Sequence, residues 1–315
     1  MRLKYLLLLI CFPLGLFAQK REQGFDYNFK PTEKYPRYYV ITEPKEGKWY
    51  REAFYIPEKS LAMVGWYKDE ECKIPDSTVT WYHTNGKLKS MGIYRDGKKE
   101  GIWQTYHENG MDLDSGLYVG GHRLGVGLSW NEDGYVTDSS YYDGKGNGVE
   151  VSWYANGPVF SAGRIINDTS KTRKWVYYHK NGQTMASEEY DNTGNRLSCN
   201  CFTEEGEKMS ECEEKEAYFP GEEQGWSRFL QKNLDAMVPI RNKVSAGYYT
   251  VLVRFVVNTD GSVGDITPMT RLGFGMEQEV VRLMKKSPKW IPAVQFGRKV
   301  KAYRLQPVTF AVTEE

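Results

Sequence analysis

The chain has 315 residues, of which 40% are hydrophobic and 14% aromatic, and its formal net charge at pH 7 is +1. This length is enough for about two domains, and a charge so close to zero gives no electrostatic reason to expect a nucleic-acid partner. The 31 glycines and 23 tyrosines favour β-hairpins over helical bundles. We therefore expect a mainly β protein.

The first residues have the features of an export signal. Arg2 and Lys4 precede an apolar run of 14 residues, Tyr5 to Ala18, which is shorter than the roughly 20 residues that a transmembrane helix needs. Ala18 is a small residue of the kind found at cleavage points. We expect residues 1–18 to be a cleaved signal peptide; a retained membrane anchor is the alternative.

Four cysteines remain after the expected cleavage: Cys72, Cys199, Cys201 and Cys212. An even number in an exported chain permits disulfides. The C-x-C pair together with Cys212 is also a weak signature of a metal site, since no histidine lies near it in the sequence. We interpret all four as structural or free thiols, leave their pairing open, and predict no metal and no cofactor.

From about Leu61 the chain repeats a short motif, an aromatic residue followed after two positions by Asn-Gly or Asp-Gly. The glycines lie at positions 86, 110, 134, 157 and 182, so the steps are 24, 24, 23 and 25 residues. This regularity predicts repeated β-hairpins, and Asn-Gly predicts type I′ turns between their strands. One hairpin cannot bury its face alone, so we expect neighbours to stack into an elongated sheet.

These motifs resemble the MORN-repeat family in its antitoxin-like variant. The resemblance rests on Trp103–Gly110, which fits W-x-x-Y-x-x-N-G, and on Gly92–Gly101, which fits G-x-Y-x-x-G-x-x-x-G. It covers about residues 61–197. The family implies hairpin rods that serve as scaffolds or interaction surfaces, sometimes at membranes, and it implies no catalysis.

Three of the four histidines occupy one repeat position, because His83, His107 and His179 each follow a repeat aromatic residue directly. Such a ladder could bind a metal, but we interpret it as equivalent positions on a solvated sheet face. The sequence contains no H-E-x-x-H, G-x-S-x-G or P-loop motif. We therefore predict no catalytic residues and no enzyme activity.

The last hundred residues read as a compact α+β unit. Trp226, Phe229 and Leu230 lie at helical spacing, and a second helical stripe runs from Met276 to Met284. Alternating apolar residues between 251 and 257 predict a strand. The economical arrangement is an antiparallel sheet with both helices on one face.

Composition thus divides the chain into five parts. An acidic stretch before the α+β unit is typical of a solvated linker, and the residues before the repeats form a polar lead-in with short strand candidates near Trp49 and Tyr55. The expected parts are the signal peptide (1–18), the lead-in (19–60), the repeat domain (61–201), the acidic linker (202–216) and the C-terminal domain (217–315).

The final strand candidate changes its hydrophobic parity. Tyr303 and Leu305 share one face by alternation, whereas Val308 and Phe310 fall on the other set. An extra residue beside Pro307 would explain the change, so we predict a β-bulge there. Proline also lacks the N–H that a central strand needs, which indicates an edge strand able to accept a partner's strand.

Residues 217–313 resemble the C-terminal domain of TonB-family energy transducers, especially the form common in Bacteroidota. The matching segments are Phe219–Gly221, Val251–Val263, Ser287–Ala293 and Gln306–Phe310. The resemblance implies that a short segment of an outer-membrane receptor, or of another envelope protein, is bound by strand addition. The docking edge that it implies consists of Val300, Lys301, Ala302, Tyr303, Arg304, Leu305, Gln306, Pro307, Val308, Thr309 and Phe310.

Departures from that family limit the prediction. Energy transducers keep a membrane anchor and a Pro-rich linker, whereas here the apolar run is short and the 13 prolines are scattered. We expect a non-enzymatic protein of the periplasm, or of the periplasmic face of the outer membrane, that recognises a partner without transmitting energy. The alternatives are a transducer with a retained anchor and a MORN-type structural or membrane-surface scaffold.

Basic residues cluster near the expected edge, at Arg298, Lys299, Lys301 and Arg304. Such a cluster attracts an acidic partner and raises its association rate. Lysine on an edge strand also blocks unwanted pairing. The sequence leaves these two roles open.

Overall fold

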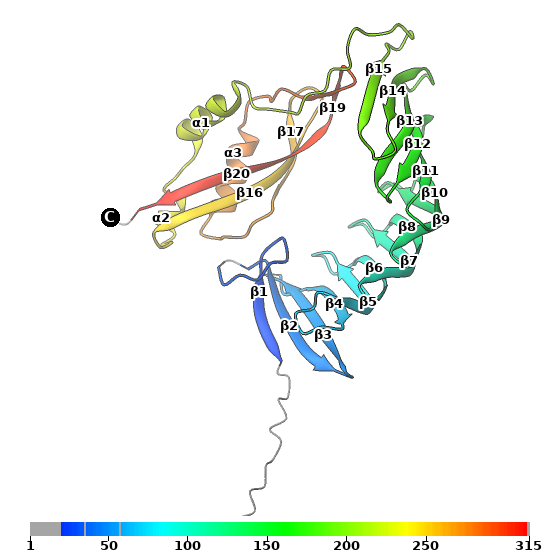
Figure 1. The fold of residues 1–315 in the computed structure, drawn as a ribbon. Coiled ribbons are helices and arrows are strands. Elements are labelled where there is room, and N and C mark those ends of the chain that lie inside the picture. The colour runs from blue at the N-terminus through cyan, green and yellow to red at the C-terminus, as the bar shows by residue number, and fades with distance from the viewer. Residues whose placement is uncertain (1–19, 35, 57, 314–315) are drawn as a thin grey trace, which may run out of the picture.

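A computed structural model describes residues 20–34, 36–56 and 58–313. Fifteen strands follow one another in a single antiparallel sheet, and the chain then forms a smaller α+β domain. The sheet curves into a crescent, and the C-terminal domain lies across its open side (Figure 1). The expected signal peptide lies outside the described residues. None of the helices in the described part of the chain has the length and apolar character needed to span a bilayer.

Each strand of the large sheet pairs with its neighbours in sequence, which confirms the expected long antiparallel sheet. The strands are β1 (Arg21–Phe25), β2 (Tyr38–Lys45), β3 (Lys48–Tyr55), β4 (Leu61–Tyr67), β5 (Pro75–Tyr82), β6 (Leu88–Arg95), β7 (Lys98–Tyr106), β8 (Asp112–Val119), β9 (His122–Trp130), β10 (Val136–Asp143), β11 (Gly148–Trp153), β12 (Val159–Ile166), β13 (Ser170–Tyr178), β14 (Thr184–Tyr190) and β15 (Arg196–Cys201). Because β1–β3 belong to this sheet, the boundary expected at residue 61 is not a structural one.

Two neighbouring hairpins use different kinds of turn. Asp96 and Gly97, with φ of 52° and 77°, form a two-residue type I′ turn between β6 and β7. At the Asn-Gly motif between β5 and β6, the His83 N–H instead donates to the Lys87 carbonyl at 2.8 Å, and Gly86 is the residue of that turn with positive φ. This is a type I turn followed by a left-handed glycine, so the type I′ prediction is wrong for this motif.

Glycines on one strand make room for tryptophans on the next. A Cβ atom at Gly92 would lie 2.2 Å from the Trp103 ring, and one at Gly163 would lie equally close to Trp175. Each indole N–H donates to a backbone carbonyl of the glycine's strand, at 3.1 and 2.8 Å. Both tryptophans are therefore buried flat against the sheet, and the repeat spacing places them on the same face.

The C-terminal domain contains a three-stranded sheet in the order β17-β16-β20 and a short β18-β19 hairpin. Trp226 and Leu283, from two different helices, share one core with Val251 and Phe255 of β16, as expected for helices that cover a single face. The elements are α1 (Glu222–Asn233), α2 (Val238–Arg241), β16 (Gly247–Val257), β17 (Val263–Pro268), α3 (Met276–Lys285), β18 (Ala293–Gln295), β19 (Arg298–Val300) and β20 (Ala302–Val312).

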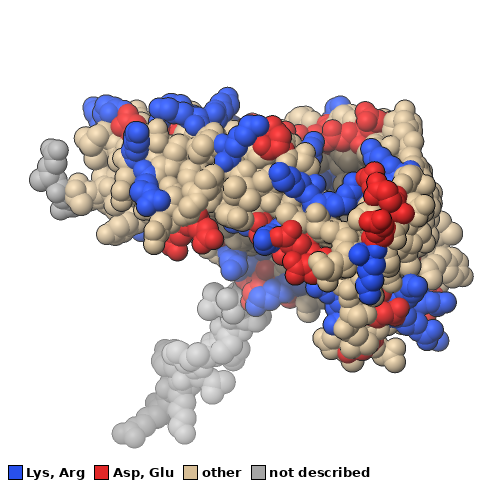
Figure 2. All heavy atoms as spheres, turned by 90° about the horizontal axis from the view of Figure 1, so that it is seen from above, with Lys and Arg blue, Asp and Glu red and all other residues tan. Residues whose placement is uncertain are grey.

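The C-terminal domain contacts both ends of the crescent (Figure 1). Near β15, Phe296 at the tip of the β18-β19 hairpin packs on Tyr177 of β13, with ring centroids 4.7 Å apart. Near β3, Arg271 forms an ion pair with Glu58. Figure 2 shows acidic and basic side chains intermixed around a hollow on the face seen from above. The domain is thus held at two places.

The acidic linker is more ordered than a freely solvated connection. It is exposed over most of its length, but a disulfide joins Cys212 to Cys201 of β15. Lys215 exchanges two backbone hydrogen bonds with Val294 of β18, at 2.9 and 2.8 Å. The linker therefore fastens the β18-β19 hairpin to the end of the large sheet.

Candidate strand-addition edge

The last strand, β20, lies at the edge of its sheet. Among the described residues it pairs with β16 on one side, and no strand pairs with its other side. The register with β16 is continuous over the whole strand, from Ala302 opposite Val257 to Val312 opposite Gly247. The bulge predicted beside Pro307 is therefore wrong.

The change of hydrophobic parity in β20 arises because this regular strand carries large apolar side chains on both of its faces. One face is buried in the core and the other is exposed to solvent. Val308 and Phe310 point into the core and are about 1% exposed. Tyr303 and Leu305 point to the outer face, where they are 70% and 51% exposed. Large apolar residues were taken as core markers in the sequence, but these two lie on the solvent side.

Pro307 occupies a position where proline leaves the sheet intact. It stands opposite Leu252 of β16, whose N–H donates to Thr270 Oγ1 at 3.1 Å and whose carbonyl accepts from the Met269 N–H at 2.7 Å. Both bonds point away from β20, so Leu252 and Pro307 form a non-hydrogen-bonded pair. The backbone at position 307 therefore faces the open edge, where a missing N–H costs no internal bond.

The same alternation identifies the other backbone groups at the open edge. Residues 303, 305, 309 and 311 have the parity of Pro307 and direct their N–H and carbonyl groups outwards. Pro307 divides this row into two halves, each with two N–H donors. A partner strand could pair with either half, and each backbone bond would contribute about 0.5–1.5 kcal/mol net.

Exposed aromatic and aliphatic side chains lie on the outer face beside this edge. Tyr248 of β16 is 85% exposed, and the Arg254 guanidinium lies 5.7 Å from the centroid of the Tyr303 ring. Arg254 is also directly opposite Leu305 in the ladder. An added strand would therefore find apolar surface for the side chains on this face.

Nine of the eleven predicted edge residues, 302 to 310, belong to β20. The other two do not. Val300 ends β19 and pairs with Ala293, and Lys301 connects β19 to β20. The edge also extends beyond the prediction to Ala311 and Val312.

Two of the four basic residues near the edge have partners within the chain. The Arg298 guanidinium contacts His179 Nδ1 at 3.0 Å and Glu204 Oε1 at 3.2 Å, and Arg304 lies 3.7 Å from Glu216. Lys299 and Lys301 are exposed. Arg298 therefore serves the docking of the hairpin, and Lys299 and Lys301 are the basic residues of this group whose side chains have no partner among the described residues.

The histidine ladder links successive repeats and does not lie on a solvated face. His83, His107 and His179 each bond through Nε2 to a backbone carbonyl 23 residues later, at 2.9, 2.8 and 3.0 Å. Because a carbonyl only accepts, Nε2 carries the proton. The His83 and His107 side chains are 12% and 15% exposed, and His179 is 1% exposed. The solvated interpretation is therefore wrong.

A buried carboxylate lies under the junction of the two domains. Glu188 accepts hydrogen bonds from Tyr177, Tyr190 and Arg196 at 2.9, 2.8 and 3.0 Å, and Lys171 lies 3.3 Å away. Burial alone would raise the pKa of Glu188, but these donors and charges hold it below its ordinary value. The sequence analysis missed this cluster because Tyr177, Lys171 and Arg196 come from the two strands beside that of Glu188 and carry no motif.

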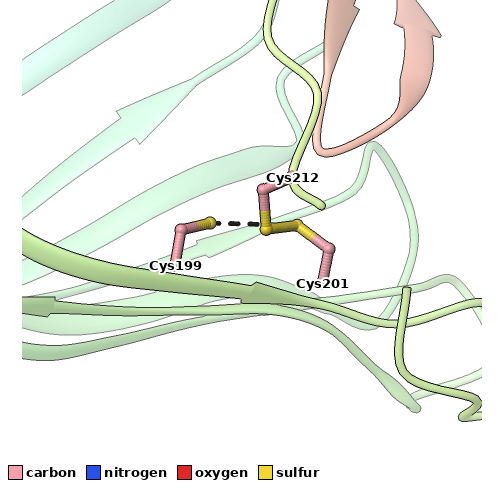
Figure 3. A group of neighbouring side chains, drawn as sticks. All are labelled: Cys199, Cys201 and Cys212. Carbon is pink, nitrogen blue, oxygen red and sulfur yellow. Dashed lines mark hydrogen bonds between the residues drawn. A yellow bond between two sulfur atoms is a disulfide. The ribbon is translucent and has the colours of Figure 1, made fainter. Parts of the chain in front are cut away.

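Three cysteines meet at the end of β15. Cys201 and Cys212 are joined by a disulfide, and the Cys199 Sγ lies 3.8 Å from the Cys201 Sγ (Figure 3). Burial raises the pKa of the Cys199 thiol, and also that of the buried Cys72 thiol. The sulfur atoms of the three cysteines lie within 4.8 Å of one another, so reduction of the disulfide would leave a set of potential metal ligands.

Comparison with known proteins identifies the repeats. A family model described as "MORN repeat variant" matches residues 75–96 and 99–111, which include β5 and β6 and most of β7. This part of the sheet carries MORN repeats. No curated protein matches the chain.

One similar solved structure is entitled "Crystal structure of GtfA/B complex bound to UDP and GlcNAc". The TM-score is 0.18 and the sequence identity 10%, over 46% of this chain and 28% of that chain. A likeness this low carries no argument about the fold or function of this chain.

Proposed function

We propose that the chain is an exported, non-enzymatic binding protein of the cell envelope. Its C-terminal domain would recognise an extended segment of a partner by β-strand addition, and the MORN-repeat sheet would serve as its scaffold. The observation that carries this proposal is the open side of β20, where four residues direct their backbone groups outwards. The resemblance to TonB-family domains supports the same edge and suggests an outer-membrane receptor, or another envelope protein, as the partner.

The scaffold role is supported by the two docking contacts of the C-terminal domain. Phe296 packs against the sheet near one end of the crescent, and Arg271 pairs with Glu58 near the other. Holding the domain at two places fixes the direction in which β20 presents its edge. A fixed edge loses less conformational entropy on binding than a mobile one.

The test is a proline substitution on the open side of the edge strand. In Leu305→Pro the lost N–H points outwards, as at Pro307, so the ladder to β16 keeps its bonds. The exposed apolar side chains of Tyr303 and Leu305 favour the half of the edge that these two residues form, so the proposal places the partner strand there. We expect the mature chain to capture an envelope protein from detergent extracts, and Leu305→Pro to reduce that capture at least tenfold. Lys232→Ala, on the exposed side of α1, is the matched control and should capture normally. Equal capture by the two variants, or no specific capture by the wild type, would refute the proposal.

A second function is favoured by the outer face of the MORN-repeat sheet. Six exposed apolar residues, one on each strand from β6 to β11, form a stripe on the sheet face that does not carry Trp103. Three pairs of these residues are direct partners in the strand ladders. Their exposed fractions range from 39% to 66%. A stripe of this extent is typical of an interaction surface, as expected for a structural or membrane-surface scaffold. It consists of Ile93, Ile102, Leu117, Val126, Tyr141 and Val149.

Two measurements separate these functions and the transducer alternative. If the stripe binds the partner, Ile102→Thr with Val126→Thr will abolish capture while Leu305→Pro leaves it unchanged. Sequencing the N-terminus of the mature protein decides whether residues 1–18 are removed. A retained N-terminus would favour an anchored energy transducer over a free binding protein.

A further inference from the structure

The three cysteines at the end of β15 form a compact sulfur cluster. Cys199 and Cys201 are two residues apart on one strand, so their side chains share a face. Cys212 approaches that face from the linker, and its Cα lies 5.4 Å from the Cα of Cys201 (Figure 3). All three sulfur atoms lie within 4.8 Å of one another. A free thiol therefore stands next to a disulfide, within reach of both of its sulfur atoms.

We propose that these residues form a thiol–disulfide exchange site in which Cys212 can be bridged to either cysteine of β15. The Cys199 thiolate attacks the Cys212 Sγ, the bond between Cys212 and Cys201 breaks, and Cys201 leaves as a thiolate. Cys199 gives its proton to solvent and Cys201 takes one up. One disulfide is exchanged for another, so no oxidant or reductant is consumed.

The geometry of the product favours attack on Cys212 over attack on Cys201, although the Cys199 Sγ also lies 3.8 Å from the Cys201 Sγ. A bond between Cys199 and Cys201 would join two residues of one extended strand, whose Cα atoms are about 6.6 Å apart. That separation lies near the upper end of the range for disulfides, about 4.4–6.8 Å. The linker cysteine is therefore the partner shared by both bridges.

A cavity at the junction of the two domains is lined by charged side chains that also act on Cys199. The cavity has a volume of about 450 Å³ and is lined by Lys171, Glu188, Arg196 and Glu214, among others. The same four side chains act electrostatically on Cys199, which is partly exposed. A small thiol such as glutathione can therefore reach the site.

Exchange at this site would move the attachment of the C-terminal domain. Cys212 leads directly into Glu213, whose carbonyl accepts from the Gly297 N–H at 3.0 Å, and into Lys215, which pairs with Val294. Moving the bridge by two residues shifts the attachment point about 6.6 Å along β15. The exchange thus gives the tether of the β18-β19 hairpin two covalent positions.

The experiment maps disulfides in the full mature chain. The protein is equilibrated with reduced and oxidised glutathione at pH 8, quenched with acid, alkylated, digested without reduction and analysed by mass spectrometry. We expect the free thiol to be divided between Cys199 and Cys201 within about tenfold, with Cys212 bridged in both forms. At pH 5 the distribution should stay as prepared, because the thiolate is the nucleophile. Cys72→Ser is the control and should give the same distribution.

Two variants isolate the two bridges. In Cys201→Ser we expect quantitative formation of the Cys199–Cys212 disulfide, with circular dichroism confirming that the sheet is retained. In Cys199→Ser the bridge should stay at Cys201 under every condition. The proposal is overturned if Cys199 and Cys212 both stay free in a folded Cys201→Ser chain, or if the wild type never bridges Cys199. It is also overturned if no disulfide forms and the three thiols instead bind one Cd²⁺ with thiolate absorbance.

Discussion

Replacing Phe296 by alanine tests how much of the docking between the two domains depends on one aromatic contact. The Phe296 ring is 2% exposed and lies in a cluster that also contains Tyr177, Met185 and Cys201 of the large sheet. Truncating a buried phenylalanine to alanine costs about 3–5 kcal/mol. Phe296 is at the tip of the β18-β19 hairpin and lies outside the core cluster of its own domain. We therefore expect the loss to fall on docking, and the C-terminal domain to remain folded.

A loss of about 3–5 kcal/mol in docking free energy predicts a large change in the accessibility of the linker. At about 1.4 kcal/mol per tenfold change, a loss of 3 kcal/mol raises the undocked population more than a hundredfold. We expect trypsin to cut between residues 202 and 216 correspondingly faster, while tryptophan fluorescence in guanidinium shows separate transitions for the two domains. Phe274→Ala is the matched control, because that ring is 38% exposed. A loss below about 1 kcal/mol with unchanged cleavage in Phe296→Ala would refute the docking argument.

Three further changes test the sheet, the buried carboxylate and the edge. Gly92→Ala should lower stability by about 1–3 kcal/mol in thermal unfolding, since its Cβ would meet the Trp103 ring, whereas Gly264→Ala has its nearest such atom at 3.6 Å and should change little. Because the folded pKa of Glu188 is depressed, its contribution should be full above about pH 5 and be lost as the pH falls below about 4. Urea unfolding of wild type and Glu188→Gln should therefore converge at acid pH. Pro307→Thr restores an outward N–H and should promote edge-to-edge association, measured by sedimentation.

The repeat spacing and the edge could be predicted because each depends on local chemistry. Glycines that recur every 23 to 25 residues determine where one of the two hairpins in each repeat turns. Pro307 indicates an edge by lacking an N–H, wherever its neighbours lie. The turn type was missed because Asn85 keeps a negative φ and uses its Oδ1 to accept the Lys87 N–H at 3.0 Å.

Features that depend on distant partners could not be predicted. The ladder histidines looked solvated because their acceptors are carbonyls one repeat away. Arg298 looked like part of a binding surface, but it bonds to His179, which lies 119 residues away. Tyr303 and Leu305 suggested a bulge because apolar residues were assumed to be buried. For the histidines and Arg298 the tertiary partner decides the role of the residue, and for Tyr303 and Leu305 exposure to solvent decides it.

The geometry of β20 also limits how tightly the proposed edge could bind. Tyr303 and Leu305 together offer two N–H and two carbonyl groups to one half of the edge, which is about 2–6 kcal/mol of net backbone bonding. Association costs at least about 4 kcal/mol in lost motion, so backbone pairing alone would give weak binding. The side chains on the outer face must then supply the remainder, and they can do so only for a short segment with apolar residues on that side. Pro307 lacks an N–H, so it excludes a long uninterrupted ladder along the edge. The same residue therefore protects the edge from unwanted pairing and limits the length of the partner segment that the proposed edge could accept.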